Sequence, residues 1–160
     1  MATRAHIAFY ETTKQPLDRP NVLLYRHSDG YPDTEYGVLA ELVPFLRRFD
    51  RERGLDDIEY AAARLLHHMI KQNAPEGTLG YGISDTLHGD IEYLYAVFAD
   101  HKAVVTFKRE FTSDTAEGPC SVFWRDQDGR RQWARCQAIA GMAFRFSGIG
   151  GVAILSKDGG

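Results

Sequence analysis

The sequence has few cysteines, no long apolar run and no excess of basic charge. Its two cysteines among 160 residues, Cys120 and Cys136, are too few for a disulfide framework and favour a reducing compartment. No run approaches the ~18 apolar residues of a membrane span, and the first residues do not form a signal peptide. The sequence therefore predicts a cytoplasmic protein with no membrane partner.

Several functional signatures are also missing. The chain has no Cys-x-x-Cys zinc pair, no Walker loop and no Gly-x-Gly-x-x-Gly, and its serines lack a nucleophile-elbow context. With 19 basic and 22 acidic side chains, the formal net charge is −3. This balance excludes a globally basic nucleic-acid binder, and the missing motifs favour a non-enzymatic protein that needs no cofactor.

What is present predicts one globular α+β domain. Apolar residues make up 44% and charged residues 26% of the chain, which are ordinary values for a folded domain. Short β-branched and aromatic runs predict strands, and two stripes with a 3.6-residue period predict helices. We expect a mainly antiparallel sheet with two helices packed on one face, in the chain order ββααβββ. The expected strands are 6–10, 22–27, 79–83, 91–98 and 103–107, and the helical stripes span 38–49 and 58–70.

The C-terminal quarter differs from the rest in charge. Residues 1–119, the expected α+β body, hold 13 basic and 19 acidic side chains, whereas residues 120–160 hold 6 and 3. Asp128-Gly129 lies between two strand-like runs that contain Trp124 and Trp133, which predicts a β-hairpin extension of the same domain. Arginines such as Arg131 interleave with these tryptophans, so any nucleic-acid contact is expected only locally, at this hairpin.

Two copies of His-x-Asp are the most suggestive motif. They are His27-Ser28-Asp29 and His88-Gly89-Asp90, and the second is followed by Glu92. On a strand, residues i and i+2 share a face, so each copy presents an imidazole and a carboxylate together. If the copies meet in space, these five side chains suit a divalent metal that activates water for hydrolysis. Against this alternative, both copies are also typical turn sequences.

A second set of candidates combines tyrosines with acidic residues. Residues 72–101 contain no Lys or Arg, and tyrosine is enriched in binding surfaces. An acidic, tyrosine-rich surface would suit a basic partner surface. Ordinary sheet packing and a solvated acidic rim explain the same pattern. The predicted binding residues are Tyr31, Asp85, Asp90, Glu92, Tyr93 and Arg131.

One stretch resembles known proteins. Residues Tyr25–Pro32 read Tyr-Arg-His-Ser-Asp-Gly-Tyr-Pro, and this is similar to a stretch in small uncharacterised proteins of bacteriophages and their bacterial hosts. The resemblance covers Val22 to Phe49. It implies a mobile-element origin and, since such proteins often bind a host factor, a host protein as partner, including a component of host defence. It implies no catalytic residues.

The sequence therefore predicts a binding protein that holds a host protein through its acidic, tyrosine-rich surface. Two alternatives stay open. One is the metal-dependent hydrolase built on the two His-x-Asp motifs, and the other is a binder of a small ligand or nucleotide in a pocket between sheet and helices. An exposed strand edge also leaves pairing with a second copy of the chain open.

Overall fold

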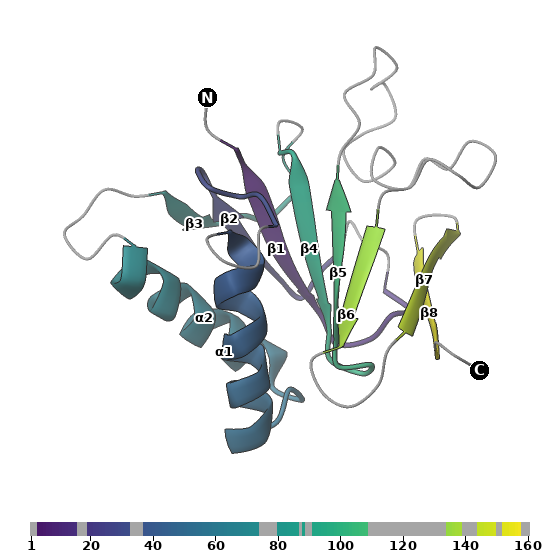
Figure 1. The fold of residues 1–160 in the computed structure, drawn as a ribbon. Helices are drawn as coiled ribbons and strands as arrows, with labels where there is room; N and C mark the ends of the chain where they lie inside the picture. Colours follow the sequence, from purple (N-terminus) through teal and green to yellow (C-terminus); the bar gives the residue numbers. More distant parts are fainter. Residues whose placement is uncertain are drawn as a thin grey trace, which may run out of the picture.

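The computed structural model describes residues 3–15, 19–32, 37–73, 80–86, 88 and 91–108, and the backbone of 134–138, 144–149 and 152–157. Two helices and eight strands lie in these residues (Figure 1). The helices are α1 (Val38–Glu52) and α2 (Ile58–Asn73). The strands are β1 (Ala5–Tyr10), β2 (Val22–Arg26), β3 (Tyr81–Ile83), β4 (Tyr93–Phe98), β5 (Ala103–Lys108), β6 (Ala134–Ala138), β7 (Phe144–Ile149) and β8 (Val152–Lys157).

The main sheet is mixed. Its strand order in space is β3-β2-β1-β4-β5-β6, and β1 runs parallel to β4 while its other described pairings are antiparallel. The α+β class is confirmed, but the expected arrangement is corrected, because the spatial order departs from the chain order and the central pairing is parallel. The physical reason is that β1, which is buried along its whole length, takes a strand on each side.

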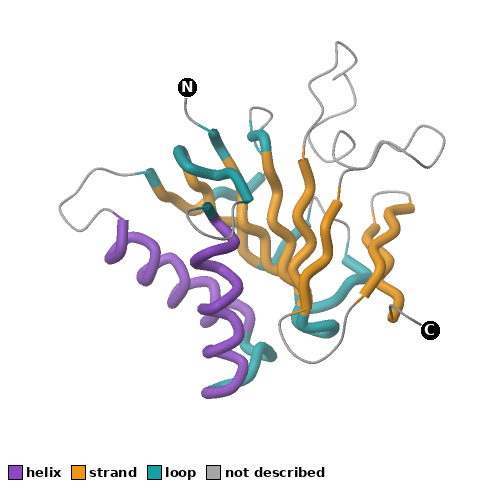
Figure 2. Tube along the Cα trace, in the orientation of Figure 1, coloured by secondary structure: helices purple, strands orange, loops and turns teal. Residues whose placement is uncertain are grey.

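Both faces of the sheet are apolar. Ile7, Phe9 and Leu24 face the helices and pack with residues such as Leu42 and Leu65. Figure 2 shows both helices on this one side of the sheet, as predicted. The opposite face is also buried, which explains why the central strands read as continuous apolar runs rather than as an alternation. The side chains of this second face include Ala8, Tyr10, Leu94, Ala96, Phe98 and Phe107.

The helix boundaries follow local chemistry with small shifts from the predicted ones. Gly54, with φ +88°, ends the turn after α1, because glycine adopts a left-handed conformation without a Cβ penalty. The backbone N–H of Tyr60 donates to Oδ1 of Asp57 at 3.2 Å, so Asp57 caps the N-terminus of α2. Pro44 lies inside α1, which continues past it as one helix to Glu52.

The C-terminal strands extend the fold beyond the predicted elements. β6 pairs with β5, placing Cys136 opposite Val105, and β7 and β8 form a separate two-stranded sheet. The Asp128-Gly129 hairpin and Arg131 lie outside the described residues, so these predictions and the boundary at residue 119 stay predictions. Within the described part of the chain, neither helix combines the length and the apolarity that crossing a bilayer requires.

Candidate functional site

One end of the sheet gathers most of the polar and aromatic residues that the sequence singles out. β2 runs antiparallel to β1, and β4 runs parallel to it. The last residues of β2 therefore lie beside the first residues of β1 and β4. His6 of β1 is paired with Tyr25 of β2 on one side and with Leu94 of β4 on the other. We call the group formed by His6, Tyr25, His27, Ser84 and His88 the histidine cluster.

His6 is the buried base of the histidine cluster, with 0% of its surface exposed. Its Nδ1 lies 3.0 Å from the backbone oxygen of Leu24, and a carbonyl only accepts, so Nδ1 carries the proton. Its Nε2 accepts a hydrogen bond from the backbone N–H of His88 at 3.0 Å. This geometry assigns one neutral tautomer to His6. His6 is not among the site residues predicted from the sequence, although its place in a strand that is apolar on both faces is a signal for burial.

The two His-x-Asp segments meet around Tyr25. The ring of His27 lies 6.2 Å from the Tyr25 ring, and the ring of His88 lies 5.0 Å from it. The Tyr25 hydroxyl is 3.0 Å from Nδ1 of His27, and Ser84 Oγ is 3.3 Å from Nε2 of His88. The other ring nitrogen of each imidazole has no partner within the described residues. Both side chains are exposed, so each keeps one nitrogen for a ligand or a proton.

Of the carboxylates predicted as metal ligands, those of Asp29 and Glu92 lie in the described residues. Asp29 is exposed, with φ 55°, a left-handed conformation that Asp tolerates better than most residues. Glu92 is partly exposed, and Asp90 lies outside the described residues. Among the residues described, no group of three or more His, Cys, Asp or Glu is arranged to hold a metal ion. The complete metal set proposed from the sequence, which includes Asp90, therefore stays a hypothesis.

On the helix side of the same sheet end, a buried arginine fixes the loop that follows β2. Nε of Arg26 donates to the Ser28 backbone oxygen at 3.0 Å, and its guanidinium lies 3.7 Å from Glu41 of α1. The guanidinium also lies over the Tyr81 ring, 5.6 Å from its centroid. Arg26 thus links the loop, α1 and β3 around one charge, which explains why an arginine is tolerated at a buried position.

Tyr95 anchors the same loop from β4. Its hydroxyl donates to the Gly30 backbone oxygen at 2.5 Å, and the Gly30 N–H donates to the Thr3 oxygen at 2.9 Å. Burial raises the pKa of Tyr95 well above its ordinary value, and the neighbouring Tyr93 adds to this while Arg26 opposes it. The loop 27–32 is therefore held at Gly30 by hydrogen bonds to both of its backbone polar groups. These bonds position the residues on either side of Gly30.

The predicted binding residues fall into three groups. Tyr31, Glu92 and Tyr93 are partly exposed at this sheet end, where the Glu92 N–H donates to the Arg4 oxygen and Tyr93 pairs with Ala5. Asp85 is exposed and follows Ser84, whose N–H donates to the Leu23 oxygen on the β3 side. Asp90 and Arg131 lie outside the described residues.

No match to a known protein adds to this geometry. The chain matches no family model, no curated protein and no solved structure. Its function is therefore argued from the side chains themselves.

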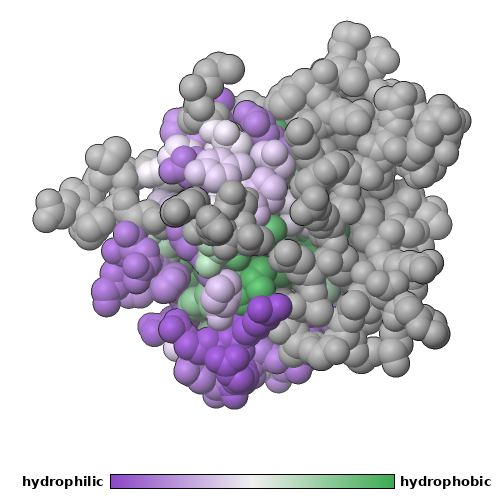
Figure 3. Space-filling view, viewed as in Figure 1, coloured by the Kyte–Doolittle hydropathy of each residue, from purple (hydrophilic) through white to green (hydrophobic). Residues whose placement is uncertain are grey.

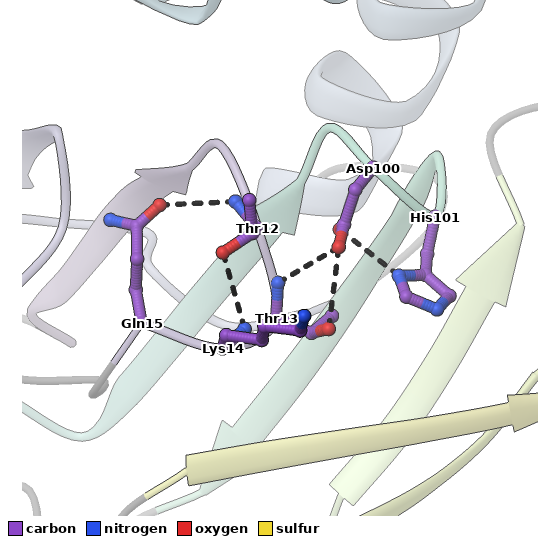
Figure 4. A network of polar contacts seen from close by, with 6 residues as sticks. All are labelled: Thr12, Thr13, Lys14, Gln15, Asp100 and His101. Carbon is purple, nitrogen blue, oxygen red and sulfur yellow. Dashed lines mark hydrogen bonds and ion pairs between the residues drawn. The ribbon is translucent and has the colours of Figure 1, made fainter.

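A second polar network lies at the opposite end of the sheet (Figure 4). Oδ2 of Asp100, in the turn between β4 and β5, accepts the Thr13 N–H at 3.0 Å and the Thr13 hydroxyl at 3.3 Å. Its Oδ1 lies 3.0 Å from Nδ1 of His101. Thr12, Lys14 and Gln15 hydrogen-bond among themselves beside it. Because these groups satisfy one another, the network ties the loop after β1 to the β4–β5 turn.

Proposed function

We propose that this chain is a binding protein of phage or mobile-element origin that holds a host protein, such as a component of host defence, at the sheet end that carries the histidine cluster. The observation that carries this proposal is the set of partly exposed tyrosines, Tyr25 of β2, Tyr31 of the loop after β2 and Tyr93 of β4. Tyrosine offers a large contact area at low entropic cost. Here the segments that carry the tyrosines are already fixed by packing and hydrogen bonds.

The stretch that resembles phage proteins supplies much of this surface. Tyr25, His27, Asp29 and Tyr31 all belong to it, and the loop 27–32 is held in place by Arg26 and Tyr95. Such ordering before binding lowers the entropic cost of association. The exposed carboxylate of Asp29 and the partly exposed one of Glu92 have no ion-pair partner in the described part of the chain. They favour a partner whose contact surface is basic.

Site-specific photo-crosslinking in host cells tests the proposal. A photoreactive phenylalanine analogue is placed at Tyr31 or at Tyr93 and, as the control, at Lys14, which is exposed at the opposite end of the sheet. We expect one host protein to be captured from both site positions and not from Lys14. With that protein purified, Tyr31→Ala should weaken binding by about tenfold, as for an aromatic contact of about 1.4 kcal/mol. Equal capture at all three positions, or capture at none, would contradict the proposal.

A second candidate function is favoured by one specific observation, the contact of both imidazoles with the Tyr25 ring. This geometry supports the alternative of a divalent-metal-dependent hydrolase that uses His27, Asp29, His88 and Asp90, with Glu92 as a further candidate ligand. Calorimetric titration of the full chain with Zn²⁺ and Mn²⁺ tests it. The alternative requires about one equivalent to bind, and binding to be lost in His27→Ala and in His88→Ala. His67→Ala, on the exposed side of α2, is the control. Absence of binding in the unaltered chain would end this alternative.

A further inference from the structure

A groove runs between the outer surfaces of α1 and α2. Two adjoining cavities of about 390 Å³ and about 290 Å³ form it, and both are lined by Phe45 and Arg48. The two helices contact each other along it, with the ring centroids of Phe45 and His68 5.5 Å apart and those of Phe49 and Tyr60 5.9 Å apart. We call this feature the inter-helix groove; its principal residues are Phe45, Arg48, Phe49, Tyr60, Arg64 and His68.

The floor of the inter-helix groove is aromatic. Phe45 and Phe49 are 7% and 8% exposed, whereas Tyr60 is 39% exposed. Among the described residues, the exposed large hydrophobic side chains are those of Tyr60 and Ile83, and Tyr60 lies in the groove. Aromatic residues with a polar tip at the edge of a cavity are typical of contact sites for other molecules.

The walls of the groove are mainly basic. Arg48 and Arg64 have no ion-pair partner in the part of the chain that the structure describes, and the Arg48 guanidinium lies 5.9 Å from the Phe45 ring centroid. Arg53 is already engaged, since it stacks at 4.0 Å on Tyr60 and lies 3.8 Å from Asp57. Figure 3 shows strongly hydrophilic residues over the last turns of α1. The two unpaired guanidiniums therefore present positive charge beside an aromatic floor.

We infer that the inter-helix groove binds an acidic peptide segment of a partner protein, one that carries an aromatic or aliphatic anchor between carboxylates. The anchor covers the aromatic floor, and the carboxylates pair with Arg48 and Arg64, whose guanidiniums suit bidentate contacts. This site is separate from the histidine cluster and would take a partner of the opposite charge.

Charge complementarity favours a peptide over a nucleic acid. Glu41 lines one cavity and Glu52 the other, so negative charge flanks the basic centre of the groove. A phosphate backbone carries a charge at every nucleotide and would meet these carboxylates. Residues 1–119 also hold six more acidic than basic side chains, and this excess repels a chain charged at every nucleotide more strongly than a peptide with only a few carboxylates. A peptide places its carboxylates only where the groove is basic.

A peptide-display selection on the full, unaltered chain tests this inference without a known ligand. We expect enrichment of peptides that combine Asp or Glu with a Phe, Trp or Leu anchor. A fluorescein-labelled synthetic copy of the most enriched peptide should bind the unaltered chain. Its affinity should fall about tenfold or more in Arg48→Glu and in Arg64→Glu, which is the loss expected for one charged contact of about 1.4 kcal/mol.

The matched control is Arg51→Glu, which changes charge equally on an exposed position of α1 that does not line the groove. It should leave peptide affinity within about twofold. Unchanged circular dichroism and melting temperature would show that the variants are folded. Failure to enrich acidic peptides, an equal loss in Arg51→Glu, or tighter binding of a 20-nucleotide oligouridine probe that Arg48→Glu abolishes would each overturn the inference. Tyr31 and Tyr93 line neither cavity of the inter-helix groove, so the crosslinking result at the sheet end tests a different surface from this one.

Discussion

At the residue scale, Gly30 is the position at which the loop after β2 has least room. A Cβ on Gly30 would lie 2.7 Å from the Thr3 oxygen and 2.8 Å from the Ala5 Cβ, closer than such atoms approach. We expect Gly30→Ala to lower the free energy of unfolding by about 1–3 kcal/mol, the usual cost of overpacking. Urea denaturation measures it. Gly82→Ala is the control, because its Cβ would meet nothing within 4 Å; equal losses in both variants would contradict the steric argument.

His6 offers a second test at this scale, because its two hydrogen bonds require one tautomer. The backbone oxygen of Leu24 can only accept a hydrogen bond, and the backbone N–H of His88 can only donate one. We therefore expect ¹⁵N chemical shifts of the imidazole to show the Nδ1–H form at neutral pH. The exposed His67 provides the reference for an imidazole in water. Detection of the Nε2–H form at His6 would mean that the contact with His88 is absent in solution.

At the element scale, α1 continues through a proline that should disfavour it. Pro44 is exposed, removes one intrahelical hydrogen bond and crowds the preceding turn. The helix persists because its other face is buried through residues such as Leu42 and Leu46. We expect Pro44→Ala to raise the free energy of unfolding, by up to about 3 kcal/mol. Urea denaturation measures the change beside Arg51→Ala, a substitution at an exposed position of the same helix. A gain no larger than that of the control would show that Pro44 costs the helix little.

The elements also show which parts of the fold the sequence predicts. The stripes that contain Leu42 and Leu65 predict both helices and their buried faces, because a 3.6-residue period has one structural meaning. The run Tyr93–Phe98 predicts a central strand. The parallel pairing of β1 with β4 was not predictable, since a strand that is apolar on both faces reads the same beside either kind of neighbour. Pro44 shows the limit of local rules, because packing outweighs an unfavourable residue.

The candidate site depends on the whole molecule in the same way. The sequence selects His27 and His88 as separate motifs, but their meeting around Tyr25 requires β4 to lie next to β1, which no local pattern encodes. His6 was missed because a single histidine in an apolar strand has no spacing partner. The inter-helix groove was also missed. Arg48 reads as a favourable charge near a helix C-terminus, and only the packing of α2 against α1 brings Arg64 to the same cavity.

At the scale of the whole molecule, stability should fall at alkaline pH through Tyr95. Burial raises the pKa of this tyrosine in the folded chain above its ordinary value, so above about pH 10 the unfolded chain releases a proton that the folded chain retains. The contribution of Tyr95 is therefore complete below about pH 10 and is lost as the pH rises, by at most about 1.4 kcal/mol per pH unit.

Urea denaturation between pH 8 and 11 measures this dependence. Tyr95→Phe should lower the free energy of unfolding at pH 8 by about 1 kcal/mol, because the hydrogen bond to the Gly30 oxygen is lost. The same variant should lose less stability than the unaltered chain as the pH rises, because the group that titrates is gone. Tyr60→Phe, at a partly exposed position, should keep the alkaline slope of the unaltered chain. If Tyr95→Phe keeps that slope as well, another buried group governs the alkaline unfolding, and the anchoring role of Tyr95 is limited to its hydrogen bond.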